Sequence, residues 1–495
     1  MNLRRSFLMS GIDRYLTLAV NLGVMAALAR LLTPDEVGAF VVGAAVVMVA
    51  EALRDFGASS YLVQAQDVSC ESVRTTFTVM AGMAVVVTIL LNVGAEPLAV
   101  YYADTRIASV IRIASMTVIL NAVAAPALAL WRRDLAFGTL AVINLCGVVG
   151  NAVASLLLAA FGWGYLSLAL GTLSGSAASA AAATLHRPRP WIYRPYLHEL
   201  RSILTFGGVA SATAIMNIAY QMLPQLCLGG LAGLEAAGLY NRAMTLSQLP
   251  ERAVVSAFQP VLLPAFAGTA RSGGDLTGAY LHGLALFSAI QWPVLFCLAI
   301  LAEPVVEVVL GAQWGEVASL LRIMALGGLA LFPAYLTYPM LLALGRVRDT
   351  LTASLISLPP SALLVVGAAP FGPRGVALSL SVTGLLQAWV AVALIRRRAP
   401  FRWADLLAAL RKSAVVALCA AAVPAGLATW TATGIGIGGL CLALAGGAAG
   451  WVAGLFLSGH PLWTEVRLAG SQVIPLACGW LKGAGLGLSA GARGD

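Results

Sequence analysis

The sequence predicts an all-α polytopic membrane protein with about fourteen transmembrane helices, built as two six-helix lobes related by a pseudo-two-fold axis plus two C-terminal helices. Charged residues are 10% and hydrophobic residues 60% of the 495 positions, whereas an ordinary soluble domain carries about 25% charged residues. Long apolar stretches alternate with short polar breaks, as helical membrane proteins require. The second part of the chain also repeats features of the first.

Each predicted span is an apolar stretch near the roughly 20 residues that a membrane-crossing helix needs. The first begins after Arg4-Arg5 and is interrupted by Asp13 and Arg14, so we interpret it as an uncleaved helix. The boundary near 263–278 is the least distinct, and a mildly amphipathic segment follows near 462–482. The spans are 6–31, 37–62, 74–96, 108–131, 138–160, 164–185, 203–228, 237–263, 278–302, 317–344, 350–370, 374–396, 412–432 and 435–457.

The basic residues predict the orientation of the chain. With the N-terminus inside, 21 Lys and Arg residues fall on the cytoplasmic side, three (Arg30, Arg106 and Arg374) fall outside, and six lie within spans. Positively charged loops stay in the cytoplasm. We therefore expect a multi-pass protein of the bacterial inner membrane with both termini cytoplasmic, and the net charge of +9 needs no nucleic-acid partner.

An internal repeat predicts the domain organisation. Six residues from Arg5 to Asn21 recur 196 positions later, from Arg201 to Asn217, and Gly38 recurs as Gly238 at an offset of 200. Two repeats in the same orientation are a known transporter plan. The expected units are an N-terminal lobe (1–185), a basic cytoplasmic linker (186–202), a C-terminal lobe (203–398), two extra helices (399–458) and an amphipathic or flexible tail (459–495).

Cysteine and histidine give no metal or disulfide signal. The seven cysteines and four histidines are scattered, and no pair has the spacing of metal ligands. We therefore expect neither a metal nor a bound cofactor, and coupling of transport to H⁺ or Na⁺ remains an option.

Polar residues concentrate on one face of four spans, the first and second of each repeat. An ionisable group at membrane depth costs roughly 2.5–3.5 kcal/mol on insertion scales, so it faces protein or water rather than lipid. One interpretation is helix-to-helix pairing, for example Asp13–Arg54 or Arg14–Glu51. The interpretation that we favour is a wet cavity between the lobes. The stripes contain Arg14 and Asn21, with Asp13 adjacent; Glu51 and Asp55, with Arg54 beside them; Asn217, Gln221 and Gln225; and Asn241, Gln248 and Arg252.

Two segments resemble bacterial polysaccharide flippases of the MATE-like (MOP) superfamily. LLTPDEVGAFVVGAAVV at 31–47 resembles the turn into the second helix of that family, and Asp55-Phe56-Gly57 resembles the element that follows it. Leu234 to Ala243 resembles the matching turn before the eighth helix, although it lacks the proline. The resemblance implies two V-shaped lobes with helices 1, 2, 7 and 8 lining a cleft.

The resemblance also implies a function. Such proteins flip polyprenyl-diphosphate-linked oligosaccharide repeat units across the inner membrane by alternating access, for exopolysaccharide, O-antigen or capsule synthesis. The expected partners are undecaprenyl-diphosphate-linked oligosaccharide, membrane lipid, and a polysaccharide polymerase and copolymerase. Arg14, Arg54, Arg242 and Arg252 match a diphosphate site, and Asn21, Asn217, Gln221 and Gln248 suit sugar hydroxyls. Asp13, Glu51, Asp55 and Glu251 are candidates for ion coupling or salt bridges.

Two other functions remain open. A cation-coupled multidrug exporter of the MATE type needs a carboxylate site, which Asp13, Glu51 and Asp55 could supply, but the arginine content disfavours cationic drugs. A membrane glycosyltransferase or ligase usually has a large outer loop, and every expected outer loop here is short. We therefore expect a transporter and no enzyme.

Overall fold

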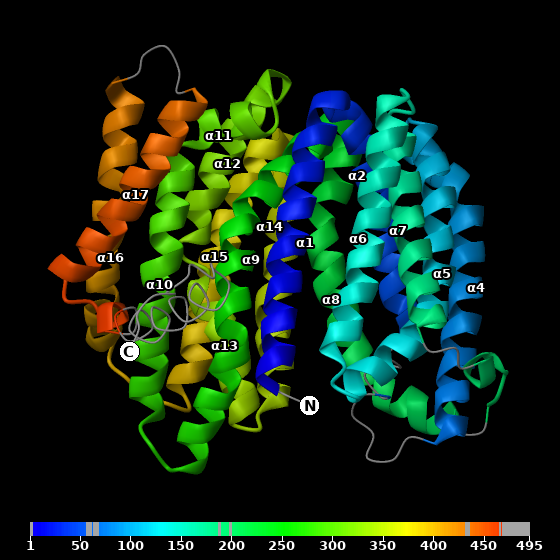
Figure 1. Ribbon diagram of the computed structural model, residues 1–495, viewed down its shortest axis with the longest axis horizontal. Helices are drawn as coiled ribbons and strands as arrows, with labels where there is room; N and C mark the ends of the chain where they lie inside the picture. The colour runs from blue at the N-terminus through cyan, green and yellow to red at the C-terminus, as the bar shows by residue number, and fades with distance from the viewer. Residues whose placement is uncertain are drawn as a thin grey trace, which may run out of the picture.

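The computed structural model describes residues 3–55, 62, 69–186, 190–197, 200–430, 436–464 and 467, and these residues are almost entirely helical. Figure 1 shows long helices running side by side across one slab. The first part of the chain contains α1 (Leu3–Leu31), α2 (Pro34–Asp55), α4 (Cys70–Tyr101), α5 (Arg106–Arg133), α6 (Phe137–Ala160), α7 (Tyr165–Leu185) and the short 3₁₀ helix η1 (Pro190–Tyr193).

The later part of the chain continues the bundle. It contains α8 (Leu200–Leu231), α9 (Leu234–Arg271), α10 (Leu276–Ile300), α11 (Ala302–Val309), η2 (Ala312–Trp314), α12 (Gly315–Gly328), α13 (Phe332–Ala343), α14 (Val347–Ala368), η3 (Ala369–Phe371), α15 (Gly372–Arg396), α16 (Trp403–Trp430) and α17 (Ile437–Leu457).

Ten of the described helices are long and apolar enough to cross a membrane. The number is eleven if α12 and α13, which meet at a 46° bend, form one broken span. An all-helical polytopic membrane protein, as predicted, is therefore what the chain forms. Two local features differ from the expectation. The predicted span 317–344 is broken at residues 329–331, and the expected outer loop at 303–316 contains α11 and η2.

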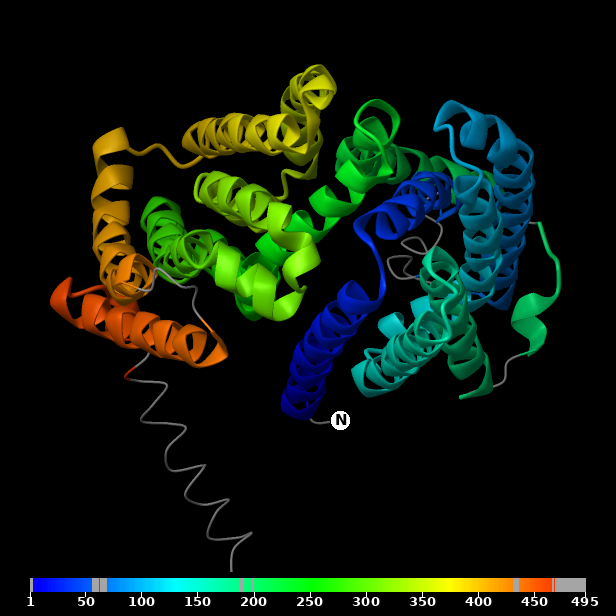
Figure 2. The ribbon, with the colours of Figure 1, turned by 90° about the horizontal axis from the view of Figure 1, so that it is seen from above.

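The helices gather into two groups, seen from above in Figure 2. The first group contains α2, α4, α5, α6 and α7, and the second contains α9, α10 and α12 to α15, with α16 and α17 packed on α10. Helix α1 lies between the groups, and α8 contacts members of both, notably α2 and α14. These packing partners leave α1, α2, α8 and α9 at the boundary between the groups.

Apolar packing at one end joins the two groups. We call the end of the bundle that holds the α1–α2 turn the outer end, following the orientation predicted from the basic residues. One continuous buried cluster there combines Val42 and Ile107 of the first group with Leu228, Tyr240 and Trp314 from the other side of the boundary. Burial of large apolar side chains is the main driving force for such closure. The outer end of the boundary is therefore shut by a hydrophobic core.

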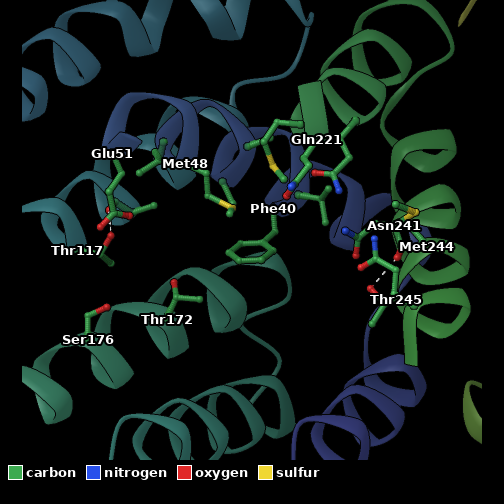
Figure 3. Close-up of a pocket in the computed structure, with 18 of the residues that line it drawn as sticks. Phe40, Met48, Glu51, Thr117, Thr172, Ser176, Gln221, Asn241, Met244 and Thr245 are labelled. Carbon is green, nitrogen blue, oxygen red and sulfur yellow. Dashed lines mark hydrogen bonds between the residues drawn. The ribbon is translucent and has the colours of Figure 1, made fainter. Parts of the chain in front are cut away.

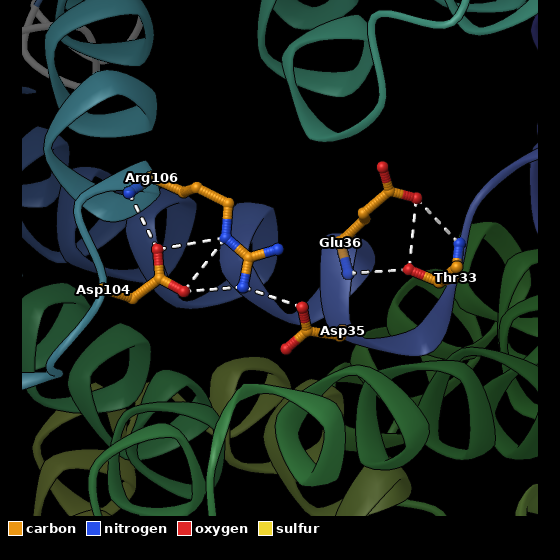
Figure 4. A network of polar contacts seen from close by, with 5 residues as sticks. All are labelled: Thr33, Asp35, Glu36, Asp104 and Arg106. Carbon is orange, nitrogen blue, oxygen red and sulfur yellow. Dashed lines mark hydrogen bonds and ion pairs between the residues drawn. The ribbon is translucent and has the colours of Figure 1, made fainter.

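The α1–α2 turn is fixed by a capping box and an ion network (Figure 4). Thr33 Oγ1 accepts a hydrogen bond from the backbone N–H of Glu36 at 3.3 Å, and the Glu36 carboxylate accepts one from the N–H of Thr33 at 2.9 Å. Arg106 forms ion pairs with Asp35 at 2.7 Å and with Asp104 at 2.6 Å. The hydrogen bond from Arg106 holds the pKa of the Asp104 carboxyl below its usual value. This network ties the start of α2 to the α4–α5 turn.

Candidate substrate cavity between the helix groups

A cavity of about 490 Å³ lies at the boundary between the two groups. Its walls come from α2, α5 and α7 on one side and from α8 and α9 on the other. Figure 3 shows Glu51 and Thr117 at one side of the cavity, Asn241 and Thr245 at the other, and Phe40 between them. The cavity therefore joins residues that are more than two hundred positions apart in sequence.

The first-group wall holds a carboxylate that is already partnered. Glu51 Oε1 accepts a hydrogen bond from Asn121 Nδ2 at 2.7 Å and lies 3.4 Å from Arg54 Nη2. Arg54 is buried, and its Nε and Nη1 atoms have no hydrogen-bond partner among the described residues. Of the two pairings considered from the sequence, Glu51–Arg14 is not formed, since Arg54 and Asn121 occupy this carboxylate. The cavity therefore meets a carboxylate whose charge is largely compensated.

The opposite wall is the polar stripe of α9. Asn241, Thr245, Gln248 and Arg252 all line the cavity, because residues three or four apart share a face of a helix. The Arg252 side chain is exposed, and its Nη2 donates a hydrogen bond to Gln248 Oε1 at 2.8 Å. A guanidinium group that is held by a neutral amide rather than by a carboxylate keeps its positive charge available for an anion.

A second cavity of about 450 Å³ lies on the far side of α8 and α9. It is lined by residues of α8 and α9 together with residues from α10, α12, α13, α14 and α15. Gln221, Met244, Gln248 and Arg252 line both cavities. The two cavities therefore meet along one shared wall, which contains Arg252.

The structure brings some of the predicted site residues together and leaves others apart. Glu51, Gln221, Gln248 and Arg252 line the first cavity, and Asn217, Gln221, Gln248, Glu251 and Arg252 line the second. Arg14 and Asn21 are exposed residues of α1 and line neither cavity. The side chains of Asp13 and Asp55 lie outside the described residues.

Arg242 lies apart from both cavities. Its side chain is buried, and its guanidinium carbon lies 5.6 Å from the centre of the Trp314 ring. Trp314 in turn donates a hydrogen bond from Nε1 to the carbonyl oxygen of Ala29, at the end of α1, at 2.7 Å. Arg242 therefore supports the closed outer end in this structure, and it does not face the space where an anion would bind.

Sequence reasoning missed the polar residues of α5 and α7. The first cavity is lined by Thr117, Asn121, Thr172 and Ser176. The span of α7 has no charged residue that would have indicated a polar wall. The available signal was spacing: Thr117 and Asn121 are four apart, as are Thr172 and Ser176, so each pair shares one helix face. The described residues contain no group of three His, Cys, Asp or Glu side chains that could hold a metal ion.

Two glycines close the outer end of the boundary above the cavity. A Cβ atom at Gly38 would overlap the carbonyl oxygen of Leu234, and one at Gly238 would overlap that of Pro34. The first turns of α2 and α9 thus touch through their backbones, which only glycine permits at this separation. These two glycines are the pair that the internal repeat predicts to be equivalent.

Comparison with known sequences identifies the family. The model of the polysaccharide biosynthesis protein family matches residues 27–319. The succinoglycan biosynthesis transport protein ExoT of Rhizobium meliloti (strain 1021) is 28% identical over 331 residues, which are 64% of this chain and 65% of ExoT. The lipopolysaccharide biosynthesis protein WzxC of Escherichia coli (strain K12) is 23% identical over 327 residues, 65% of each chain. The chain thus matches about two thirds of the length of these relatives.

Solved structures of the same fold are transporters. The lipid II flippase MurJ in an inward closed conformation superposes with a TM-score of 0.75 at 12% identity, over 93% of this chain and 100% of MurJ. An inward-facing multidrug resistance MATE transporter of the MOP superfamily gives 0.62 at 13% identity, over 79% of this chain and 98% of that one. At such identities the likeness establishes the fold.

These findings confirm the family that the segments at 31–47 and 234–243 suggested, and they agree with the prediction that the chain is not an enzyme, since ExoT is named a transport protein. The chain is a member of the polysaccharide biosynthesis protein family and has the fold of the MOP transporters.

Proposed function

We propose that the protein moves a polyprenyl-diphosphate-linked oligosaccharide repeat unit from the inner to the outer leaflet of the bacterial inner membrane by alternating access. The observation that carries the proposal is the polar cavity at the boundary of the two helix groups, with the exposed Arg252 in its wall and a sealed outer end above it. Exopolysaccharide, O-antigen and capsule are the products that such a unit would build.

The topology that suits this function is a span count of fourteen. Counting the 48-residue stretch Asp349–Arg396 as two spans brings the ten candidates to eleven. Adding the bent pair α12–α13 as one span, and α8 and α9 as one span each, brings the number to fourteen. An even count puts both termini in the cytoplasm, in accord with the distribution of Lys and Arg. The lobes are then 1–185 and 203–398, joined by the linker 186–202, with 399–458 as two additional helices and 459–495 as a cytoplasmic tail.

The chemistry of the cavity suits an anionic, polyhydroxylated ligand. Arginine binds phosphate oxygens in a bidentate manner, and the amides and hydroxyls of α5, α7, α8 and α9 can hydrogen-bond sugars. A MATE-type exporter of cationic drugs would require a free carboxylate in the first cavity, but Glu51 there is paired with Arg54 and hydrogen-bonded by Asn121. Glu251, which lines the second cavity, is the described carboxylate that we assign to ion coupling with H⁺ or Na⁺.

Replacement of Arg252 tests the proposal. In the strain that carries this gene, Arg252→Ala should reduce surface polysaccharide by roughly ten- to a hundredfold, because a hydrogen bond to a charged group contributes about 1.5–3 kcal/mol. Arg54→Ala should also reduce the polymer, but it removes the ion-pair partner that lies 3.4 Å from Glu51, so its effect would mix loss of an arginine with an uncompensated carboxylate. Arg252 is therefore the more diagnostic position.

A matched control separates charge in the cavity from charge elsewhere. Arg112 pairs with Glu96 at 2.6 Å, both side chains are exposed, and neither lines the two cavities. Arg112→Ala should leave polymer levels unchanged at equal protein level, since neither Arg112 nor Glu96 faces a cavity. Wild-type polymer in Arg252→Ala, at equal protein level in the membrane, would remove this residue from the mechanism.

A further inference from the structure

The second cavity contains a buried hydrogen-bond acceptor without a partner. Gln291 of α10 lines this cavity and is only 2% exposed. Its Oε1 atom accepts no hydrogen bond from any described residue. A buried polar atom left unsatisfied costs about 1–3 kcal/mol. A cavity-lining acceptor kept at that cost indicates a ligand that supplies the missing donor.

Apart from Glu251 and Arg252, the rest of the lining combines neutral hydrogen-bonding side chains and aromatic rings with apolar residues. Gln387 Nε2 donates to the Tyr220 hydroxyl at 3.2 Å, and Tyr220 donates to Thr383 Oγ1 at 3.2 Å, so that one chain of hydrogen bonds links α8 to α15. Tyr335 of α13 hydrogen-bonds the Glu251 carboxylate. Such a network fixes the orientation of each donor and acceptor before a ligand arrives.

The positions of the charged side chains indicate which part of a ligand each cavity would bind. Among the residues that line the second cavity, Arg252 and Glu251 are the charged ones, and Arg252 stands on the wall shared with the first cavity. An anionic group would therefore stay at the shared wall. A neutral, polyhydroxylated group attached to that anion would find its hydrogen-bond partners beyond the wall, in the second cavity.

We propose that the second cavity, built around Gln291 and the Tyr220–Thr383–Gln387 chain, binds the outer sugars of the lipid-linked oligosaccharide while the diphosphate lies at Arg252. This inference rests on the proposed function and assigns the recognition of glycan length and identity to α8, α10 and α15. Sugar hydroxyls donate to Gln291 Oε1, and the tyrosine rings supply flat surfaces for the sugar rings. The diphosphate makes its contacts at the shared wall, and the first sugar makes its contacts in the first cavity.

The test compares two lipid probes on purified, full-length protein in detergent. One is the lipid-linked oligosaccharide extracted from the strain that carries the gene, and the other is the same lipid trimmed enzymatically to its first sugar. Gln291→Leu should weaken binding of the complete oligosaccharide by about three- to tenfold, which corresponds to one neutral hydrogen bond. It should leave the affinity for the trimmed lipid unchanged.

A melting temperature and two further variants serve as controls for Gln291→Leu. Because leucine removes the unsatisfied acceptor, Gln291→Leu should melt at the temperature of the wild type or higher. Gln387→Leu, which breaks the hydrogen-bond chain from the α15 side, should reproduce the selective loss. Ser361→Ala, at a buried hydroxyl of α14 that bonds its own helix at Ser357 and lines neither cavity, should change neither affinity.

The outcomes separate this inference from the proposed function. Equal weakening of both probes, or no weakening, by Gln291→Leu and Gln387→Leu would overturn the sugar subsite and leave the transport proposal intact. Unchanged binding of the trimmed lipid in Arg252→Ala would instead contradict the diphosphate site on which the proposed function depends.

Discussion

Three of the arginines that the sequence predicts for a diphosphate site lie in different environments in the structure. Arg252 is exposed in the cavity wall, Arg54 is buried against Glu51, and Arg242 is buried against Trp314. Spacing along a helix predicts which face a side chain shares, but not how deeply its neighbours cover it. That depth depends on residues far away in sequence, such as Trp314. Of the four helices expected to line a cleft, α2, α8 and α9 line the cavities and α1 does not, while α5 and α7 were not expected, so the candidate site was predictable only in part.

Another buried polar residue, His460, gives a pH prediction. It follows α17, and its ring lies 3.1 Å from Ser413 Oγ through Nε2, while Nδ1 accepts the backbone N–H of Leu462 at 3.1 Å. Burial, with Lys412 and His282 nearby, lowers the pKa of His460 to about 4, from an ordinary 6.5. Protonation would place an N–H at Nδ1 against the N–H of Leu462, so the folded state resists it.

The sign of the pH effect follows from the lowered pKa of His460. The unfolded chain takes up this proton near pH 6.5 and the folded chain near pH 4, so stability from His460 is complete above 6.5 and falls between 6.5 and 4. The melting temperature of the purified protein should drop by a few degrees more across this range than that of His460→Asn. His186→Asn, at an exposed histidine, should keep the wild-type profile. Parallel profiles for His460→Asn and wild type would contradict the assignment.

The two helix starts that the repeat relates, at α2 and α9, form the contact that closes the outer end. Their equivalence was predictable because Gly38 and Gly238 recur at a fixed offset. Their contact was not, because one sequence does not show which turns meet. Two element boundaries also escaped prediction for a physical reason. The apolar residues run on through the α12–α13 bend, so hydropathy does not mark the break. Helix α9 continues to Arg271, beyond the predicted span 237–263, because hydropathy predicts the length of an apolar stretch and not the length of the helix that contains it.

A side chain at either glycine should force the outer ends of α2 and α9 apart. Gly238→Ala puts a methyl group into the carbonyl of Pro34, which is backbone and cannot move aside cheaply. We expect transport to fall at least about tenfold, since a shift of about 1.4 kcal/mol against the closed outer end suffices for that factor. Radiolabelled sugar incorporated into surface polymer is a suitable measure.

The matched control for this substitution is another helical glycine. Gly94→Ala in α4 meets no atom within 4 Å of the added Cβ, and alanine favours a helix over glycine by about 1 kcal/mol. Gly94→Ala should therefore keep full transport and a melting temperature at least equal to that of the wild type. Full transport in Gly238→Ala as well would show that the glycine contact is not required.

At the scale of the molecule, the structure is sealed at its outer end and polar within. Alternating access requires that this seal open in another state, so every contact across it sets the balance between states. The tie at the end of α1 is one such contact. Gln313 and Trp314 both donate hydrogen bonds to the carbonyl oxygen of Ala29, and Arg30 donates to that of Val308 at 2.9 Å. These bonds fasten the outer end of α1 to the second helix group, and farther along α1 the Tyr15 hydroxyl donates a hydrogen bond to the carbonyl oxygen of Ala253 in α9 at 3.4 Å.

Cys227 of α8 can report the opening of that end. It is partly buried against the apolar cluster of the outer end, beside Leu226, whose carbonyl oxygen accepts the Tyr102 hydroxyl at 3.3 Å. Trp314→Phe deletes the hydrogen bond to Ala29 while keeping an aromatic ring beside Arg242. One such bond contributes about 0.5–1.5 kcal/mol, so the open population should rise by about two- to tenfold.

The measurement uses a chain that keeps Cys227 as its one cysteine, in intact cells exposed to a membrane-impermeant maleimide. Trp314→Phe should raise the rate of Cys227 labelling by up to the same two- to tenfold, because parting of the two groups at the outer end uncovers more of this partly buried thiol. Trp131→Phe, at a tryptophan of the first group that lies in a separate apolar cluster, should leave the rate unchanged. If both substitutions gave the wild-type rate, the tie between α1 and the second group would not set the balance, and the apolar cluster alone would have to carry the seal.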